Sequence, residues 1–221
     1  MANLSLEAVI FDLDGVILDS HSAHVSAWQE LFRELGRELS ETDLSFVLEG
    51  YSREQILRHY LGDIALDRLH EHGARKEQLF GKRAREVTTV AGVTGFFDQL
   101  DAEHIPCAVA TSARRARTVD MLDDLGLTRR FQAIVAAEDA KYPKPDPEVF
   151  ALTAQRLQVA AESVLVCEDS LAGVAAAKAA GMKCLAIGAN GRGPMLKSAG
   201  ADAVSADFTA TSLADLRLMF A

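Results

Sequence analysis

Short apolar runs alternate with amphipathic segments along most of the chain. Runs rich in β-branched residues predict buried strands, and apolar positions repeating every three to four residues predict helices. The predicted strands span residues 8–11, 105–111, 131–136, 164–166, 184–187 and 203–204. The predicted helices span residues 114–125, 147–157, 172–180 (ending at Gly181) and 212–220. This alternation predicts an α/β fold with a doubly wound, Rossmann-like parallel sheet.

Residues 19–85 interrupt this alternation with helical periodicity and many charges. Trp28, Leu31, Phe32 and Leu35 repeat at helical spacing, which predicts a core stripe, with a binding surface as the alternative. The chain therefore divides into an α/β core, residues 1–18 and 86–221, and an inserted helical cap, residues 19–85. Hinges are expected near residues 16–20 and 83–92.

Composition narrows the classes of function. The 221 residues are 49% hydrophobic and 25% charged, as is usual for a globular protein. A net charge of −9 argues against a nucleic-acid partner but not against a small phosphorylated metabolite. No apolar run approaches the roughly 18 residues of a membrane span, and no secretory signal precedes the first strand. We therefore expect a cytoplasmic protein, monomeric or dimeric, without membrane contact.

The three cysteines, Cys107, Cys167 and Cys184, lie inside apolar runs and lack metal-ligand spacing. They are interpreted as reduced core residues of a cytosolic protein rather than catalytic thiols.

Two carboxylates, Asp12 and Asp14, follow the first predicted strand. They alternate along extended chain and so leave the same face, and Gly15 allows a sharp turn and close approach to a ligand. Acids placed together need a positive partner, commonly a divalent cation. The alternative interpretation is a strand that ends in a polar turn.

Two further clusters supply hydroxyl, amide and ammonium groups. Thr111 and Ser112 end a predicted strand just before a helix, an arrangement that can hold phosphate but also serves as a simple N-cap. Lys144 stands between Pro143 and Pro145, so its backbone is stiff and its charge is set in place, unless the loop is only a solvated turn.

A last acidic pair, Glu168 and Asp169, follows the strand predicted at 164–166. With Asp12 and Asp14 it would complete an oxygen-rich site suited to Mg²⁺. The alternative is that Asp169 or Ser170 only caps the next helix.

In this order, the four clusters resemble the haloacid dehalogenase-like superfamily, and the helical insertion resembles the cap of its β-phosphoglucomutase-like and phosphatase branch. The resemblance implies that Asp12 is the nucleophile, forming an aspartyl-phosphate, and that Asp14 is the general acid/base, a residue that the superfamily's true dehalogenases lack. It implies that Thr111, with the backbone of Ser112 and Ala113, binds the phosphoryl oxygens and that Lys144 offsets charge. It further implies Mg²⁺ held by Asp12, Asp169 and the Asp14 carbonyl, with Glu168 assisting directly or through water.

Specificity is expected to come from the cap. His24, four residues before Trp28, resembles a mutase residue that couples cap closure to proton transfer, and Arg53 resembles one that binds a distal phosphate. The alternatives are an ordinary helix residue for His24 and a pair with a cap carboxylate for Arg53. Lys76 is a further substrate-binding candidate. Nothing around Lys76 or Lys82 suggests the burial that a Schiff-base amine of a phosphonate-cleaving relative would need.

Three positions depart from the mutase pattern. Glu49 replaces a lysine, and Ala113 and Arg115 replace a serine and an asparagine. Glu49 is expected to weaken binding of a bisphosphate, and Arg115 to contact a second anionic group. These changes favour a Mg²⁺-dependent phosphatase acting on a small sugar phosphate. The alternative is a β-phosphoglucomutase, and a non-catalytic phosphosugar-binding protein is more remote.

Overall fold

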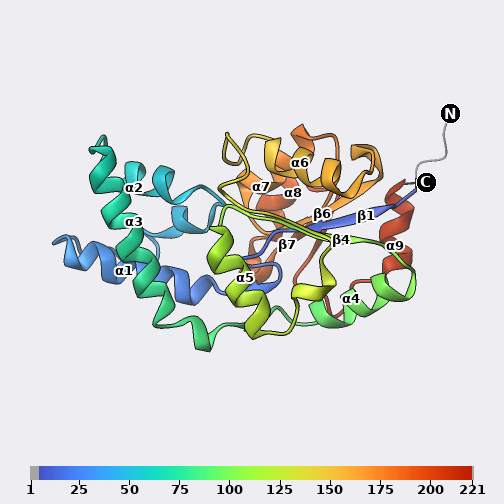
Figure 1. Ribbon diagram of the computed structural model, residues 1–221, viewed down its shortest axis with the longest axis horizontal. Helices are drawn as coiled ribbons and strands as arrows, with labels where there is room; N and C mark the ends of the chain where they lie inside the picture. Colours follow the sequence, from blue (N-terminus) through green and yellow to red (C-terminus); the bar gives the residue numbers. More distant parts are fainter. Residues whose placement is uncertain (1–4, 221) are drawn as a thin grey trace.

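A fully parallel sheet occupies the centre of the computed structural model, which describes residues 5–220 (Figure 1). Across these residues six strands pair in the order β5-β4-β1-β6-β7-β8. Their bounds are β1 Ala8–Phe11, β4 Cys107–Ala110, β5 Ala133–Val135, β6 Val164–Glu168, β7 Lys183–Ile187 and β8 Ala203–Ser205. The chain leaves β1 for β4 and β5 on one side and later returns to β6 on the other. The end of β1 is thus the topological switch point where such sheets bind ligands.

Helices cover both faces of the sheet, as predicted (Figure 1). One face carries α4 (Val93–Ala102), α5 (Arg115–Asp124) and α9 (Leu213–Arg217), and the other α6 (Glu148–Leu157), α7 (Leu171–Ala179) and α8 (Gly193–Ser198). Along β1, Val9 and Phe11 join the first core, whereas Ala8 and Ile10 join the second. Burial on both faces explains why β1 is continuously apolar.

Two of these helices were not predicted. Val93, Thr94 and Gly95 open α4 with weak helix formers, so its stability comes from burying its phenylalanines rather than from propensity. The preceding Gly92 has φ +78°, and a Cβ there would overlap the backbone of Phe208. Helix α8 is only six residues long and begins at Gly193-Pro194, a weak signal in sequence.

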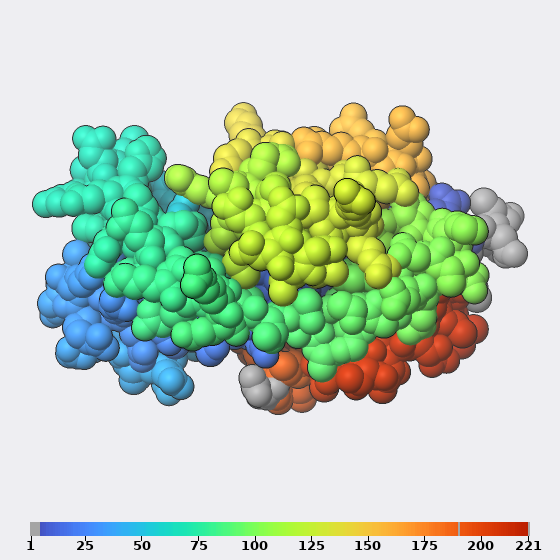
Figure 2. Space-filling model, turned by 60° about the horizontal axis from the view of Figure 1, so that its bottom comes forward, coloured from blue at the N-terminus to red at the C-terminus, as the bar shows by residue number. Residues whose placement is uncertain are grey.

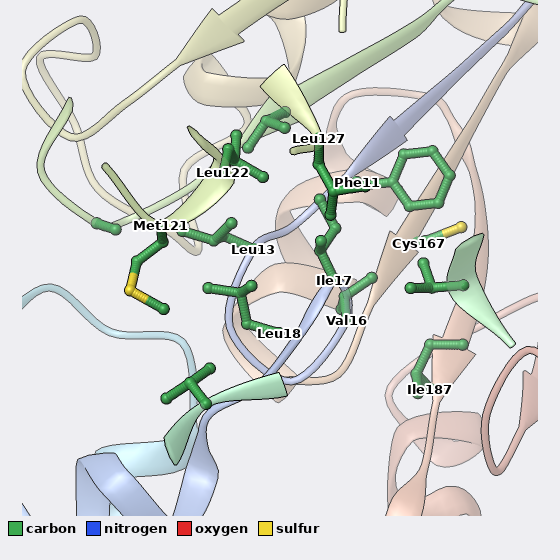
Figure 3. Close-up of a cluster of buried hydrophobic side chains, with 14 of the residues drawn as sticks. Phe11, Leu13, Val16, Ile17, Leu18, Met121, Leu122, Leu127, Cys167 and Ile187 are labelled. Carbon is green, nitrogen blue, oxygen red and sulfur yellow. The ribbon is translucent and has the colours of Figure 1, made fainter. Parts of the chain in front are cut away.

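The loop after β1 is anchored by its apolar residues. Leu13, Val16 and Ile17 pack in the same buried cluster as Met121 and Leu122 of α5 (Figure 3). Because Leu13 takes part in the core, its two acidic neighbours can serve the opposite, polar side. The apolar anchor therefore fixes where the first acidic motif lies.

The cap is built from α1 (His21–Glu34), α2 (Arg53–Leu61) and α3 (Leu66–Gly81), with one short 3₁₀ turn between α1 and α2 and another after α3. Helix α1 packs along α3, and Trp28, Leu31 and Phe32 are buried, which confirms the predicted core stripe. A capping box formed by Ser52 and Gln55 begins α2, so Arg53 lies in its first turn.

The chain crosses between core and cap through a two-stranded antiparallel ladder of β2 (Leu18–Asp19) and β3 (Thr88–Thr89). Neither strand was predicted, because two residues are too few to show a period. Both lie in the segments where hinges are expected. The domain boundaries and the hinges stay predictions.

The cysteines are buried core residues, as expected, and none is disulfide-bonded in the described chain. Over residues 5–220, no helix has both the length and the apolar composition required to span a membrane.

Candidate active site

A cavity of about 110 Å³ lies between the core and the cap. Asp12 after β1, Thr111 after β4 and Asp169 after β6 line it from the carboxyl edge of the sheet. Its volume corresponds to a handful of water molecules, so the cavity suits a small metabolite. The predicted site residues that line it are Asp12, Asp14, His24, Arg53, Lys76, Thr111, Ser112, Ala113 and Asp169.

Lys144 lies behind the cavity and holds Asp12 in place. Its Nζ donates to Asp12 Oδ1 at 2.6 Å and to Glu168 Oε1 at 2.5 Å. Burial alone would lower the pKa of Lys144, but the two carboxylates outweigh it and raise the pKa, so the amine stays charged. Lys144 is 2% exposed, which fits a positioned charge rather than a solvated turn.

Glu168 is committed to protein hydrogen bonds. One oxygen accepts from Lys144, and the other from the Asp169 amide at 2.8 Å and from the Ser170 amide and hydroxyl at 2.9 and 2.8 Å. A Cβ at Gly173 would overlap this carboxylate, so Glu168 fits under α7 because that position is glycine. In this arrangement the Glu168 carboxylate orients Lys144 and the turn that presents Asp169. Its assistance to a metal, directly or through water, stays a prediction.

In the turn after β6, Ser170 caps the next helix and Asp169 lines the cavity. Ser170 is the N-cap of α7 and accepts from the Gly173 amide at 3.0 Å. Asp169 is thereby left to face the cavity, where His21 Nε2 lies 2.7 Å from its Oδ2.

The buried carboxylates carry more negative charge than their partners offset. Burial raises the pKa of Asp12 to about 8, against the lowering effect of Lys144, and burial also raises that of Asp169, against His21. Gly15, at φ +77°, lets the loop pass so close that a Cβ would overlap Asp169. No group of three or more His, Cys, Asp or Glu side chains within the described residues forms a ready metal cage. Mg²⁺, however, is commonly bound by one or two carboxylates with water and phosphate, so Asp12 and Asp169 fit it.

Asp14 is held by donors on both of its oxygens. Oδ1 accepts from Ser20 Oγ at 2.7 Å and lies 3.1 Å from His24 Nε2. The Arg117 guanidinium binds both oxygens, at 3.0 and 2.6 Å. Burial would raise the pKa of Asp14, but Arg117 and His24 outweigh it and hold the pKa well below its usual range. Asp14 is therefore a carboxylate in the resting site.

His24 connects Asp14 to Lys76. Lys76 Nζ lies 2.8 Å from His24 Nδ1, and burial, with help from Lys76, lowers the pKa of His24 to about 4. The imidazole is thus neutral; it accepts from Lys76 at Nδ1 and donates from Nε2 to Asp14. His24 takes part in the site instead of being an ordinary helix residue.

The expectation that Lys76 is not buried is wrong. Its side chain packs with Nζ 5.6 and 5.0 Å from the ring centres of Trp28 and Phe80, and burial lowers its pKa to about 7. Lys82, by contrast, is largely exposed and pairs with Glu30 at 3.1 Å. Trp28, a core residue, also lines the cavity.

Arg53 pairs with a carboxylate of the cap, which is the alternative given for it in the sequence analysis. Nη1 donates to Glu77 Oε2 at 2.7 Å and to the Gly73 carbonyl at 3.1 Å, while the side chain still lines the cavity.

Arg115 is placed differently from the expectation. It binds Asp139 and the Ile134 carbonyl outside the cavity, and Arg117 faces the cavity in its stead. Two residues along a helix are rotated by about 200°, so these arginines point to opposite sides. The sequence analysis also missed that His21, Glu77 and Arg114 line the cavity. Of these, only His21 had a signal in the sequence, because it directly follows the hinge expected at residues 16–20.

The turn after β4 holds itself open towards the cavity. Thr111 Oγ1 accepts from the Ala113 amide at 3.0 Å, and the N-cap of α5 is Arg114, without a side-chain cap bond. Neither Thr111 nor Ser112 is the N-cap of α5. The Ser112 hydroxyl instead donates to the Gly50 carbonyl of the cap at 3.1 Å.

Glu49 belongs to the contact between cap and core. Its carboxylate accepts from Arg192 Nη2 at 3.1 Å and from the Leu171 amide at the start of α7 at 3.4 Å. It does not face the cavity, so the expected repulsion of a bisphosphate by Glu49 has no structural basis. The surfaces of cap and core meet in Figure 2, where the cap is blue to teal.

Comparisons with known proteins agree with this geometry. The sequence model of the haloacid dehalogenase-like hydrolases matches residues 9–187. A phosphorylated carbohydrates phosphatase from Thermotoga maritima is 31% identical over 80% of this chain and 83% of its own length. A β-phosphoglucomutase from Bacillus subtilis is 32% identical over 90% of this chain and 88% of its own. The crystal structure of β-phosphoglucomutase from Clostridium difficile shares the fold, with a TM-score of 0.85, 24% identity and 97% coverage of both chains. The chain belongs to the haloacid dehalogenase-like hydrolase family.

Proposed function

We propose that this protein is a Mg²⁺-dependent phosphatase that hydrolyses a small sugar phosphate through an aspartyl-phosphate. The observation that supports it most is the pairing of two acids with opposite environments in one cavity. Asp12 lies 2.6 Å from the buried Lys144 ammonium, and Asp14 is clamped as a carboxylate by Arg117. The names of the phosphatase and mutase relatives agree with phosphoryl transfer on carbohydrates.

In the first half-reaction, an Asp12 oxygen attacks phosphorus and the bond from phosphorus to the ester oxygen breaks. Lys144 offsets the charge on Asp12, and the turn at Thr111 supplies hydroxyl and amide donors for the phosphoryl oxygens. A bound Mg²⁺ at Asp12 and Asp169 would neutralise charge on the phosphoryl group. The leaving oxygen takes a proton from Asp14. Since Asp14 rests as a carboxylate, that proton arrives with the substrate, whose phosphate has a pKa of about 6.

In the second half-reaction, Asp14, again ionised, accepts a proton from a water molecule that attacks phosphorus. The bond between phosphorus and the Asp12 oxygen breaks, which restores the Asp12 carboxylate and releases phosphate. The proton on Asp14 leaves with the phosphate or passes to solvent, so Asp14 returns to its carboxylate form. The covalent route divides one difficult displacement into two easier steps.

The charge around the cavity favours one phosphate over two. Four acids line it, Asp12, Asp14, Glu77 and Asp169, and four bases, Arg53, Lys76, Arg114 and Arg117. Behind these residues, the opposite charges of Lys144 and Glu168 cancel each other. A divalent cation then leaves two positive charges, which are enough to offset one phosphate group, whereas a fully ionised bisphosphate would leave an excess of negative charge. This balance favours a phosphatase over the β-phosphoglucomutase alternative.

The decisive experiment incubates β-glucose 1-phosphate with the enzyme, Mg²⁺ and a trace of glucose 1,6-bisphosphate, and measures glucose 6-phosphate and free phosphate in one tube. A parallel panel of hexose and pentose monophosphates is assayed for phosphate release. Release from any of these sugar phosphates supports the phosphatase, and conversion to glucose 6-phosphate without release establishes the mutase. A non-catalytic binding protein would bind sugar phosphates and leave all of them intact. We further propose that the enzyme acts in the cytoplasm, as a monomer or a dimer.

A further inference from the structure

Two buried polar atoms face each other across the boundary between cap and core. Glu77 Oε1, on α3 of the cap, lies 3.7 Å from Arg117 Nε, on α5 of the core, which is beyond hydrogen-bonding distance. Lys76 Nζ is 3.9 Å from the same oxygen. Neither Glu77 Oε1 nor Arg117 Nε has a hydrogen-bond partner among residues 5–220, and both residues line the cavity.

The rest of each side chain is fully used. Glu77 Oε2 accepts from Arg53, and both Arg117 terminal nitrogens bind Asp14. The side chains are therefore fixed, and one acceptor and one donor, 3.7 Å apart as an ion pair, remain without a hydrogen bond beside the cavity. Leaving such buried atoms without a hydrogen bond is unfavourable, so a ligand group that satisfies both gains affinity.

The chemistry of the two atoms selects the ligand group. A carboxylate oxygen only accepts a hydrogen bond, and a guanidinium N–H only donates one. A hydroxyl can donate to Glu77 and accept from Arg117 at the same time. Ether and carbonyl oxygens and the oxygens of a phosphate dianion cannot donate, and a second phosphate would also meet the negative charge of Glu77.

We propose that Glu77 and Arg117 bind a hydroxyl group of the substrate and thereby select hydroxylated phosphomonoesters over bisphosphates and over alkyl phosphates. This inference rests on the proposed phosphatase function. Since one residue comes from the cap and the other from the core, the hydroxyl bridges them only when the cap is closed. Substrate hydroxyls thus stabilise the state in which cap and core together line the cavity around Asp12 and Asp14.

The test compares three substrates with six-carbon chains: sorbitol 6-phosphate, n-hexyl phosphate and sorbitol 1,6-bisphosphate. The kcat/KM of each is measured for the wild type and for Glu77→Gln, which keeps the shape but removes the charge. Glu71→Gln, an exposed position on the same helix, is the matched control. We expect the wild type to prefer sorbitol 6-phosphate over hexyl phosphate, and Glu77→Gln to reduce this preference by roughly tenfold or more, as for hydrogen bonds to charged groups. The same variant should raise the rate on the bisphosphate relative to the monophosphate, whereas a purely structural role would lower both together.

Unchanged substrate ratios in a folded Glu77→Gln enzyme would overturn the inference. If that variant does not fold, the wild type decides, because equal kcat/KM for sorbitol 6-phosphate and hexyl phosphate would overturn it as well. Failure of the wild type to release phosphate from any of the three, or from the sugar phosphate panel, would instead refute the phosphatase function.

Discussion

The two walls of the cavity have opposite electrostatic character. On the sheet side, burial raises the pKa values of the Asp12 and Asp169 carboxylates. Lys144 lowers the first and His21 the second, but neither cancels the rise. On the opposite side, Arg53 and Lys76 of the cap and Arg117 of α5 surround Glu77, and burial lowers the pKa of Lys76 to about 7. This difference indicates how the two walls divide the steps of the proposed reaction between them. In the proposed function, the first wall holds a cation and attacks phosphorus, and the second binds an anionic, hydroxylated substrate.

Removing the nucleophile from the sheet wall has the largest expected effect. Asp12→Asn cannot form the acyl-phosphate, so kcat should fall at least about 10³-fold. Phosphate release measured in a continuous assay checks this, with Asp19→Asn, an exposed aspartate at the end of β2, as the control. A loss of less than tenfold in Asp12→Asn would remove the nucleophile assignment.

Removing the metal tests the same wall from the ligand side. EDTA should reduce turnover at least about 100-fold, and Mg²⁺ should restore it, because the buried carboxylates repel the phosphoryl group unless a cation lies between them. Thermal unfolding should also shift upwards on addition of Mg²⁺ to the metal-free protein. Full activity in metal-free buffer would contradict the assignment.

The sheet wall could be predicted from the sequence because each of its residues directly follows a strand. Asp12, Thr111 and Asp169 come after buried apolar runs, and parallel strands bring their carboxyl ends to one edge. The predicted fold class, an α/β sheet with an inserted helical cap, is confirmed because strand and helix periodicities are strong signals over most of the chain. The contacts of Glu168 with Lys144 and the Ser170 turn could not be predicted, because adjacent acids look alike in sequence until the hydrogen bonds of the turn separate them.

The opposite wall could be predicted only in part. The resemblance supplies His24, Arg53 and Lys76, which line the cavity, but not Glu77 or Arg117, since the place of these two residues depends on how α3 and α5 pack. Arg115 and Arg117 show this most clearly. Both are arginines in the same helix, and the rotation of the helix, which depends on where α5 begins, decides which one reaches Asp14. The burial of Lys76 against Trp28 and Phe80 likewise depends on how α1 and α3 pack.

Arg117 and Arg115 of α5 allow a test in which one arginine contacts Asp14 and the other does not, with a smaller expected effect on kcat. Arg117→Gln removes the main group that lowers the pKa of Asp14, so that pKa rises and the acidic limb of the kcat–pH profile moves to higher pH. We expect kcat near neutral pH to fall by roughly tenfold. Arg115→Gln, which faces away from the cavity, is the matched control and should leave the profile unchanged. Identical profiles for Arg117→Gln and wild type would refute the clamp on Asp14.

The smallest expected effect concerns stability rather than turnover. Because the folded pKa of Asp12 is raised to about 8, the stability contributed by its protonated form is complete below about pH 4 and is lost as pH rises through 8. Asn cannot ionise, and it leaves Lys144 and Glu168 as a one-to-one pair. Metal-free Asp12→Asn should therefore unfold at a temperature similar to the wild type at pH 5 and a few degrees higher at pH 8. Mg²⁺ should reduce the difference at pH 8, because it stabilises the wild-type carboxylates. Thermal unfolding followed by circular dichroism measures both effects, and a wild type more stable than Asp12→Asn at pH 8 without metal would show that Lys144 fully compensates Asp12.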